Sequence, residues 1–398
     1  MDPLPDHSLT QASPSPPRHP ATVATIDLTA LAHNVSEVRR RIPPGCHILA
    51  VVKADAYGHG AVAIARALMR LDVHGLCVAS LAEGITLREA DISAPILVMG
   101  SLLPTERAEA VAQGLTPVLS EADQVRAFAE CVKHRTDPYP VHVKIDTGMG
   151  RLGVSPSEVG GILRSQYVQG PLRVEGLMTH LADADGDDVA FTANQLDRFR
   201  SVAQECRAEG YLPSLVHAAN SAAILRHPSS HFTAVRPGIM LYGYHTLGSN
   251  KGDLQLSPVL SISTMVVQVR SIAPGESVSY NLAFRACRPS RIAVLPVGYA
   301  DGYNRLLSNC GTVLVRGQEA RVVGKVCMDM TMVDVTEIPG TQPGDEAVLI
   351  GKQGTRQISA ADIAADLGTI SYEVLCTIGP RVPRICRPSV ADVEESLR

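Results

Sequence analysis

The sequence has 398 residues, of which 45% are hydrophobic and 19% are charged, and its formal net charge is −4. A chain of this length usually folds as two domains, and this composition is typical of a globular protein. A weakly acidic chain has no positive field to attract nucleic acid or an anionic membrane surface. It also contains no uninterrupted run of roughly 18–20 apolar residues, the length that a membrane-spanning helix needs.

The start of the chain and its cysteines indicate where the protein works. Residues Met1–Pro20 are rich in Pro, Ser and Asp and lack the apolar h-region of a secretory signal. We therefore expect a disordered tail over residues 1–21, and a second tail over residues 391–398. The nine cysteines are irregularly spaced and form no CxxC pair, which is typical neither of a disulfide framework nor of a zinc ribbon. We expect most of them to be reduced core residues of a cytoplasmic protein.

Short β-branched runs alternate with amphipathic helical stretches from about Thr22 to Tyr244. The expected strands are His47–Lys53, Gly75–Ser80, Ile96–Met99, Thr116–Leu119, Val141–Asp146, Arg173–Thr179, Leu215–His217 and Ala234–Leu241. The expected helices include Gly60–Arg70, Leu81–Ala90, Thr105–Gln113, Glu121–His134 and Thr192–Glu209. Apolar strands separated by helices predict a parallel sheet that is covered on both faces. About eight such units predict an α/β fold with a TIM-like (β/α)8 barrel over residues 22–248, although the pattern alone also allows a doubly wound open sheet.

The pattern changes after Gly248. Short runs rich in Val, Ile and Thr follow one another, with Gly and Pro between them. These runs are Ser261–Arg270, Arg291–Val297, Thr312–Val315, Arg321–Val326, Met332–Val335 and Glu346–Ile350. They predict a separate C-terminal all-β domain over residues 249–390, with Asn250–Asp253 as the linker.

A lysine ends the first expected barrel strand. The apolar run His47–Val52 continues directly into Lys53, and an ammonium group there must be paired, solvated or chemically converted. A Schiff base with a cofactor aldehyde would remove the buried charge and anchor pyridoxal 5′-phosphate (PLP). From this position alone, a salt-bridged or snorkelling lysine is the more common interpretation.

Other polar residues follow later strands, at the edge where barrel enzymes place their reactive groups. His180 ends one of these strands, although a hydrogen-bonded core histidine is the simpler interpretation there. A phosphate binds backbone N–H groups and hydroxyls near helix starts. Asn220-Ser221 and Gly238-Ile239 could supply such groups, but could equally be a helix cap and a tight turn.

Together, these segments resemble the alanine racemase family, whose members are PLP enzymes with an N-terminal barrel and a C-terminal β domain. The resemblance extends from about Thr22 to Arg387. It rests on motifs that occur in the same order, namely Val51–Gly60, Lys144–Gly153, Val235–Gly243, Val278–Tyr280, Val297–Gly302 and Val326–Asp329. It implies a homodimeric isomerase with shared active sites that interconverts L-alanine and D-alanine, the latter for peptidoglycan.

The resemblance also implies roles for single residues around the cofactor. Lys53 would hold PLP and act as one catalytic base, and Tyr280 from the second subunit would act as the other base. Arg236 would face the pyridine nitrogen and, because arginine keeps its proton, would leave that nitrogen neutral and so limit transamination. The cofactor-binding residues implied are Lys53, Tyr57, His180, Asn220, Ser221, Arg236, Gly238, Ile239 and Tyr372.

A further set of residues is implied at the substrate and at the entrance. Arg151 and the backbone of Met328 would bind the substrate carboxylate. Lys144 would be carbamylated and would fix Arg151, because two buried cations side by side would repel each other. Tyr299 and Asp329 would guard the entrance. No metal ion is expected.

Two departures from the family and one alternative for Lys144 remain open. Asn281 stands where the family usually has Gly, so the loop after Tyr280 is expected to differ in shape. Gly379-Pro380 stands where the family usually has Ser-Tyr, which affects the rim of the site. Lys144 could also remain a plain lysine paired with Asp146.

Other activities also fit the sequence pattern. A broader racemase that accepts serine would need only a wider pocket. A PLP amino-acid decarboxylase of the same barrel-plus-β class is a second alternative, although no glycine-rich phosphate turn precedes a helix. A PLP carrier without turnover is a third, but carriers resembling this barrel lack the β domain.

Overall fold

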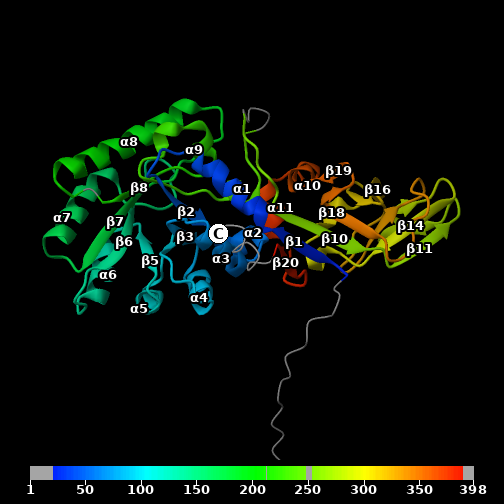
Figure 1. Ribbon diagram of the computed structural model, residues 1–398, viewed down its shortest axis with the longest axis horizontal. Coiled ribbons are helices and arrows are strands. Elements are labelled where there is room, and N and C mark those ends of the chain that lie inside the picture. Colours follow the sequence, from blue (N-terminus) through cyan, green and yellow to red (C-terminus); the bar gives the residue numbers. More distant parts are fainter. Residues whose placement is uncertain (1–20, 212, 248–252, 389–398) are drawn as a thin grey trace, which may run out of the picture.

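The computed structural model describes residues 21–211, 213–247 and 253–388, without the side chains of residues 167–169. Its N-terminal part is a closed barrel of parallel strands surrounded by helices, and a β-rich domain extends to one side of it (Figure 1). The expected tails over residues 1–21 and 391–398 lie outside the described residues, apart from Ala21. Of the expected linker, only Asp253 is described.

The barrel confirms the (β/α)8 prediction and excludes the open sheet. Neighbouring strands are parallel, and β9 pairs with β2 to close the ring. The strands are β2 (His47–Val51), β3 (Gly75–Val78), β4 (Ile96–Val98), β5 (Thr116–Leu119), β6 (Tyr139–Lys144), β7 (Leu172–Met178), β8 (Leu215–His217) and β9 (Ala234–Val235). The helices around them are α1 (Leu28–Arg39), α3 (Ala61–Arg70), α4 (Leu81–Glu89), α5 (Arg107–Ala112), α6 (Ala122–Val132), α7 (Val159–Gln169), α8 (Val189–Ala208) and α9 (Ser221–Arg226).

The first and last barrel strands are shorter than the sequence pattern predicts. After β2 the chain turns at once into a short helical segment, α2 (Lys53–Gly58). The run Ala234–Leu241 is a strand only over its first two residues, and a 3-10 turn covers Ile239–Tyr242. Pro237 has no N–H group to donate to a ladder, which explains why pairing stops there. The helices α1 and α7 were not predicted.

The C-terminal domain confirms the prediction of a β-rich unit, but it also contains two helices, α10 (Ala360–Leu367) and α11 (Ser371–Cys376). Its main sheet has the order β11-β14-β17-β16-β15-β18-β10-β1-β20. The strands are β1 (Val23–Asp27), β10 (Leu260–Met265), β11 (Gln268–Ile272), β14 (Ser290–Leu295), β15 (Thr312–Val315), β16 (Gln318–Val322), β17 (Thr331–Asp334), β18 (Glu346–Gln353), β19 (Arg356–Ile358) and β20 (Arg384–Arg387). A separate hairpin is formed by β12 (Ser277–Val278) and β13 (Phe284–Arg285).

The N-terminal strand belongs to the sheet of the C-terminal domain. β1 lies between β10 and β20, antiparallel to the first and parallel to the second. α1 then carries the chain to the barrel. Asp27 caps its start, because the Asp27 carboxylate accepts a hydrogen bond from the Ala30 N–H at 2.9 Å. α11 packs against α2, so the C-terminal domain also contacts the turn that begins at Lys53.

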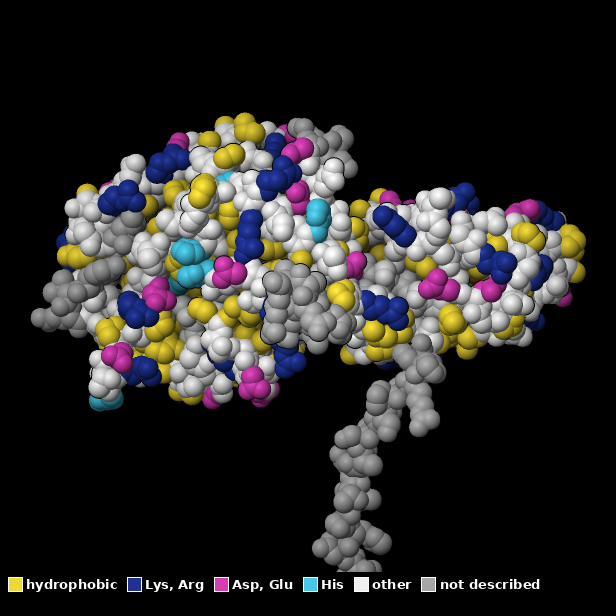
Figure 2. Space-filling view, in the orientation of Figure 1, with side chains coloured by type: hydrophobic (Ala, Val, Ile, Leu, Met, Phe, Trp, Pro, Cys, Tyr) yellow, Lys and Arg dark blue, Asp and Glu magenta, His cyan; other side chains and the backbone are white. Residues whose placement is uncertain are grey.

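The cysteines and the surface charges complete the description. All nine cysteines are free, but only Cys77 and Cys206 are buried. The prediction that most of them lie in the core is therefore wrong, because apolar neighbours in sequence do not place a residue on the inner face of its element. On the visible face, cations and anions are interspersed (Figure 2). Among the described residues, no helix has the length and apolarity to cross a membrane.

Candidate functional site

The segment after β2 has an unusual backbone conformation. Ala54, Asp55, Ala56 and Tyr57 all have φ between 52° and 55°, which forms one left-handed turn directly after Lys53. Each such residue costs about 1–2 kcal/mol relative to the right-handed form, so the surroundings must hold the turn in place. The Glu83 carboxylate accepts a hydrogen bond from the Ala54 N–H at 2.7 Å, and Asp55 caps the start of α3. The turn brings Lys53 and Tyr57 to the same end of the barrel.

The hydroxyl of Tyr57 lies next to hydroxyl and backbone N–H groups of the kind that bind a phosphate. A Cβ atom at Gly238 would lie 2.5 Å from that hydroxyl, so only glycine leaves room for the tyrosine. The Ser221 hydroxyl accepts hydrogen bonds from the N–H groups of Gly238 and Met240, at 2.9 and 3.3 Å. The N–H of Ile239 between them has no hydrogen-bond acceptor among the described residues. These groups form a cradle that can accept an anion.

Two further predicted residues lie beside this cradle. The Asn220 side chain accepts a hydrogen bond from the Ala223 N–H at 3.0 Å and so caps α9. The ring of Tyr372, on α11, lies 5.8 Å from that of Tyr57, and burial raises its pKa to about 12. Burial also raises the pKa of Tyr57 well above its usual value. Both phenols therefore keep their protons and can donate hydrogen bonds.

Arg236 is buried inside the barrel with no carboxylate partner among the described residues. Its Nη1 donates to the backbone oxygen and to Nδ1 of His217, at 2.9 and 2.8 Å. Its Nη2 donates to the backbone oxygens of Thr179 and Ala218, at 2.8 and 2.9 Å, and lies 3.4 Å from Nδ1 of His180. Four good acceptors therefore match the four Nη hydrogens. The fifth hydrogen, on Nε, has no acceptor among the described residues.

Lys144 ends β6 and lies close to several other cations. Its side chain is 3% exposed, and burial, followed by the charges of Arg151 and Arg236, lowers its pKa to about 8. Asp146 does not form an ion pair with it: one carboxylate oxygen accepts hydrogen bonds from the N–H groups of Gly148 and Met149, both at 2.9 Å. The ammonium of Lys144 makes no ion pair or hydrogen bond within the described part of the chain.

His180 lies next to this cationic group. Burial, together with the charges of Arg236 and Lys144, lowers its pKa to about 3, so its imidazole is neutral near pH 7. The charges of Arg236, Lys144, Arg151 and Lys53 all lower the pKa of this one imidazole, so these four predicted residues lie within electrostatic range of His180.

Four predicted residues form a second group on the C-terminal domain. Tyr280 is 67% exposed and lines a surface cavity together with Met328 and Asp329. The backbone of Tyr299 joins this group, because its N–H donates to the Cys327 oxygen at 3.0 Å. No residue of the barrel group lines this cavity. Within one chain, the structure therefore does not bring Tyr280 together with Lys53.

The two departures from the family have local explanations. Asn281 has φ 59° in the turn after Tyr280, a conformation that asparagine tolerates better than most residues, so it can stand in for glycine. A Cβ at Gly379 would lie 3.0 Å from the Ala300 oxygen, and its N–H donates to the Asp301 oxygen at 3.0 Å. Gly379 thus lets the C-terminal segment approach the loop that carries Tyr299.

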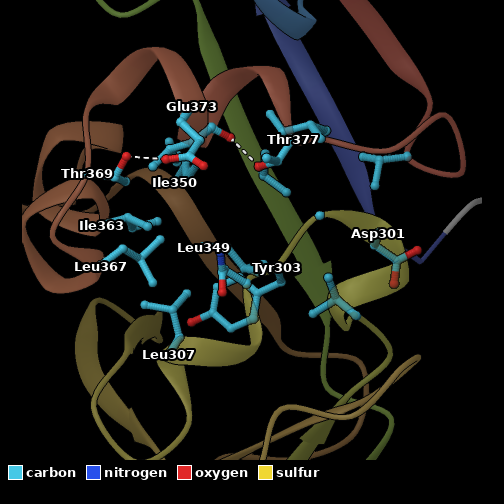
Figure 3. A pocket seen from close by; sticks show the side chains of 17 residues that line it. Asp301, Tyr303, Leu307, Leu349, Ile350, Ile363, Leu367, Thr369, Glu373 and Thr377 are labelled. Atoms are coloured by element: carbon cyan, nitrogen blue, oxygen red, sulfur yellow. Dashed lines mark hydrogen bonds between the residues drawn. The ribbon is translucent and has the colours of Figure 1, made fainter.

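An apolar cavity of about 40 Å³ lies behind that loop, between it and α11 (Figure 3). Its walls include Leu307, Ile363 and Val374, and the buried Tyr303 hydroxyl has no hydrogen-bond partner among the described residues. None of the predicted site residues lines it. Its volume is enough for only a few water molecules.

Sequence reasoning missed some residues of the barrel group. His142 and His217 form a 2.8 Å hydrogen bond inside the barrel, next to Arg236. Tyr242 donates to the Val51 oxygen at 2.9 Å, and its ring lies 4.8 Å from that of Tyr57. Strand alternation could have indicated His142, because it lies two residues before Lys144 and therefore on the same face of β6.

Two family models match the sequence in chain order. The model for the N-terminal domain of alanine racemase matches residues 26–246, and the model for its C-terminal domain matches residues 259–386. An alanine racemase of Halothermothrix orenii is 43% identical over 363 residues, which cover 91% of this chain and 96% of that protein. One of Sorangium cellulosum is 43% identical over 376 residues, covering 92% and 99%.

Solved structures give the same result. The alanine racemase of E. faecalis superimposes with a TM-score of 0.87 at 34% identity, covering 93% of this chain and 99% of that one. The alanine racemase of Bartonella henselae, solved with covalently bound pyridoxal phosphate, gives a TM-score of 0.82 at 30% identity, covering 92% and 100%.

Proposed function

This chain belongs to the alanine racemase family, and we propose that it interconverts L-alanine and D-alanine by a two-base mechanism with PLP held in its barrel. The observation that carries the proposal is the barrel group itself, in which Lys53, an anion cradle and a buried Arg236 meet at one end of the strands. The chemistry also fits a cytoplasmic enzyme that supplies D-alanine for peptidoglycan.

The residues present fit the cofactor. The aldehyde carbon would be held by Lys53, and the phosphate by the Tyr57 and Tyr372 hydroxyls with Ser221, Gly238 and Ile239, beside Asn220. The free Ile239 N–H and the room that Gly238 leaves for the Tyr57 hydroxyl support this assignment. His180 would lie against the ring, and the Nε–H of Arg236 would face its nitrogen. When bound, PLP withdraws electrons from the Cα atom of alanine and so weakens its C–H bond.

Racemisation needs one group to remove a proton from Cα and another to deliver one to the opposite face. Lysine amines and tyrosine phenols as residue types have similar reference pKa values, about 10.4 and 10, so a Lys–Tyr pair suits a reaction that runs equally well in both directions. Lys53 would act from the barrel side. Tyr280 lies on the C-terminal domain, away from Lys53 of the same chain. It would therefore come from a second subunit, so we propose a homodimer with shared sites.

Arg151 and the Met328 backbone would hold the substrate carboxylate, and Tyr299 and Asp329 would line the entrance. For Lys144 we propose a carbamate. A pKa near 8 leaves a sizeable fraction of the amine neutral, the form that adds to carbon dioxide, and the product is an anion beside Arg151. Intact mass with and without bicarbonate tests this: an unchanged mass would support the plain amine.

The direct test of function is to incubate the purified chain with PLP and L-alanine and to measure D-alanine. Borohydride reduction followed by peptide mapping should then place the cofactor adduct on Lys53. L-serine is the matched second substrate, and its racemisation at a comparable rate would indicate a broader racemase. Release of carbon dioxide without D-alanine would indicate a decarboxylase. If neither D-alanine nor carbon dioxide is formed, the proposal is contradicted.

A further inference from the structure

The interior of the barrel contains two imidazoles that the proposed reaction does not use. His217 ends β8 and His142 lies on β6, and both are almost completely buried. His142 Nδ1 lies 2.8 Å from His217 Nε2, and His217 Nδ1 lies 2.8 Å from Nη1 of Arg236. The three side chains therefore form one hydrogen-bonded chain that ends at the guanidinium.

Arg236 fixes the direction of both hydrogen bonds between these three side chains. A guanidinium can only donate, so Nδ1 of His217 must accept and its proton must be on Nε2. That Nε2–H then donates to Nδ1 of His142, which places the proton of His142 on its own Nε2. Because an imidazolium could not accept from Arg236, both rings must be neutral. Burial and the Arg236 charge lower both pKa values, that of His142 to about 3, in agreement with this assignment.

The strand geometry around His142 makes room for this arrangement. The pairing register of β6 with β7 shifts between Val141 and His142, and Gly176 lies opposite the imidazole. A Cβ atom at Gly176 would lie 2.4 Å from Nδ1 of His142. The register shift and the glycine opposite the ring leave room for His142 to lie against His217.

We propose that His142 is a positioning residue that, through His217, keeps Arg236 turned as a permanent hydrogen-bond donor toward the cofactor nitrogen. This inference rests on the proposed function for what Arg236 faces, but the hydrogen-bond chain stands on this structure alone. Without an acceptor at position 142, the Nε2–H of His217 has no partner. The cost of this unpaired donor is relieved when the His217 ring turns away from Arg236, which lets His217 take either tautomer and frees the guanidinium to move.

Matched variants separate the role of His142 as a hydrogen-bond acceptor from its role in packing. H142N keeps an oxygen acceptor at the position of Nδ1, whereas H142L keeps the bulk but removes the acceptor. His231 is an equally buried histidine that takes no part in the hydrogen bonds between His142, His217 and Arg236. Its ring bonds to the Ile224 oxygen at 3.1 Å. H231L therefore controls for the loss of a buried imidazole.

The test is the tautomer of His217, read from ¹⁵N signals of histidine-labelled full-length protein without cofactor. We expect a single Nε2–H form in the unchanged chain, in H142N and in H231L, and loss of that single form in H142L. A proton on Nδ1 of His217 in the unchanged chain would overturn the proposal, and so would an H142L spectrum identical to it. If H142L does not fold, the unchanged chain still decides.

A second readout uses the PLP-loaded protein. A displaced Arg236 no longer keeps the cofactor nitrogen neutral, so amino-group transfer from alanine to PLP, in which water supplies the oxygen of the released pyruvate, should increase relative to racemisation. We expect an increase of about tenfold, equivalent to about 1.4 kcal/mol, in H142L but not in H142N. An equal increase in both variants would assign the effect to packing and contradict the proposal. Failure to bind PLP would contradict the proposed function but leave the ¹⁵N result valid.

Discussion

The imidazoles of His142, His180 and His217 are buried near the Arg236 guanidinium, and this makes the folded state sensitive to acid. Burial, followed by the charge of Arg236, lowers all three pKa values below 6.5. The unfolded chain can take up protons at these positions as the pH falls through 6.5, whereas the folded chain cannot until the pH approaches the lowered values. Stability is therefore lost as the pH falls.

We expect the free energy of unfolding in urea to decrease steadily between pH 7.5 and pH 5. The variant H180N removes one of the three groups and should show a smaller decrease, although its activity will suffer. A wild-type stability that stays level over this range would mean that the folded chain takes up protons as readily as the unfolded chain, and would contradict the lowered pKa values.

Gly238 tests the anion cradle. In G238A the new methyl group would lie 2.5 Å from the Tyr57 hydroxyl and push that phenol aside. We expect PLP affinity, measured by fluorescence titration of the cofactor-free protein, to fall at least about tenfold, the equivalent of one lost hydrogen bond of about 1.5 kcal/mol. G160A is the control, because a Cβ there meets nothing within 4 Å. Unchanged affinity in G238A would argue against a phosphate site at Tyr57.

At the scale of elements, the left-handed turn after β2 stores strain that a single substitution can release. Ala54 is exposed and has φ 52°, a conformation that glycine adopts freely. We expect A54G to raise the free energy of unfolding by up to about 1 kcal/mol. A193G, on the exposed face of α8, should instead lower it by about 1 kcal/mol. Equal destabilisation by both, measured in urea, would mean that the turn at Ala54 is not strained.

How far the elements could be predicted depended on whether periodicity or long-range pairing determined them. The strands β5 and β8 were predicted with their observed ends, because apolar runs in a parallel barrel are bounded by polar residues. The left-handed turn at Ala54–Tyr57 was not foreseeable, because non-glycine residues visit this conformation singly and very rarely four in a row. The two helices of the C-terminal domain were hidden by the surrounding β-branched runs.

The same distinction holds for the site. Lys53, His180 and Gly238 could be proposed because each stands at a strand end or within a recognisable motif. The hydrogen bond of His142 to His217 depends on a register shift between β6 and β7, which no local pattern reveals. The separation of Tyr280 from Lys53 likewise depends on how the two domains are arranged in space.

At the scale of the whole molecule, the separation of the two residue groups leads to a complementation test. K53A and Y280F should each be inactive, because each removes one base from both sites of a dimer. When the two variants are unfolded together and refolded as a mixture, half the dimers should be mixed, and each should contain one intact site. We expect about a quarter of the wild-type activity, assayed as D-alanine formed. Y280F refolded alone is the control, and a mixture no more active than its parts would contradict shared sites.

The position of β1 has a consequence for how the protein is made. Val23 pairs with Ser263, and Ala24 pairs with Arg384, so β1 leaves the ribosome long before the strands that pair with it have been synthesised. At roughly 5–20 residues per second, the first partner follows only after on the order of tens of seconds. During that delay the nascent chain presents an unpaired apolar edge, which a holding chaperone would be well placed to cover.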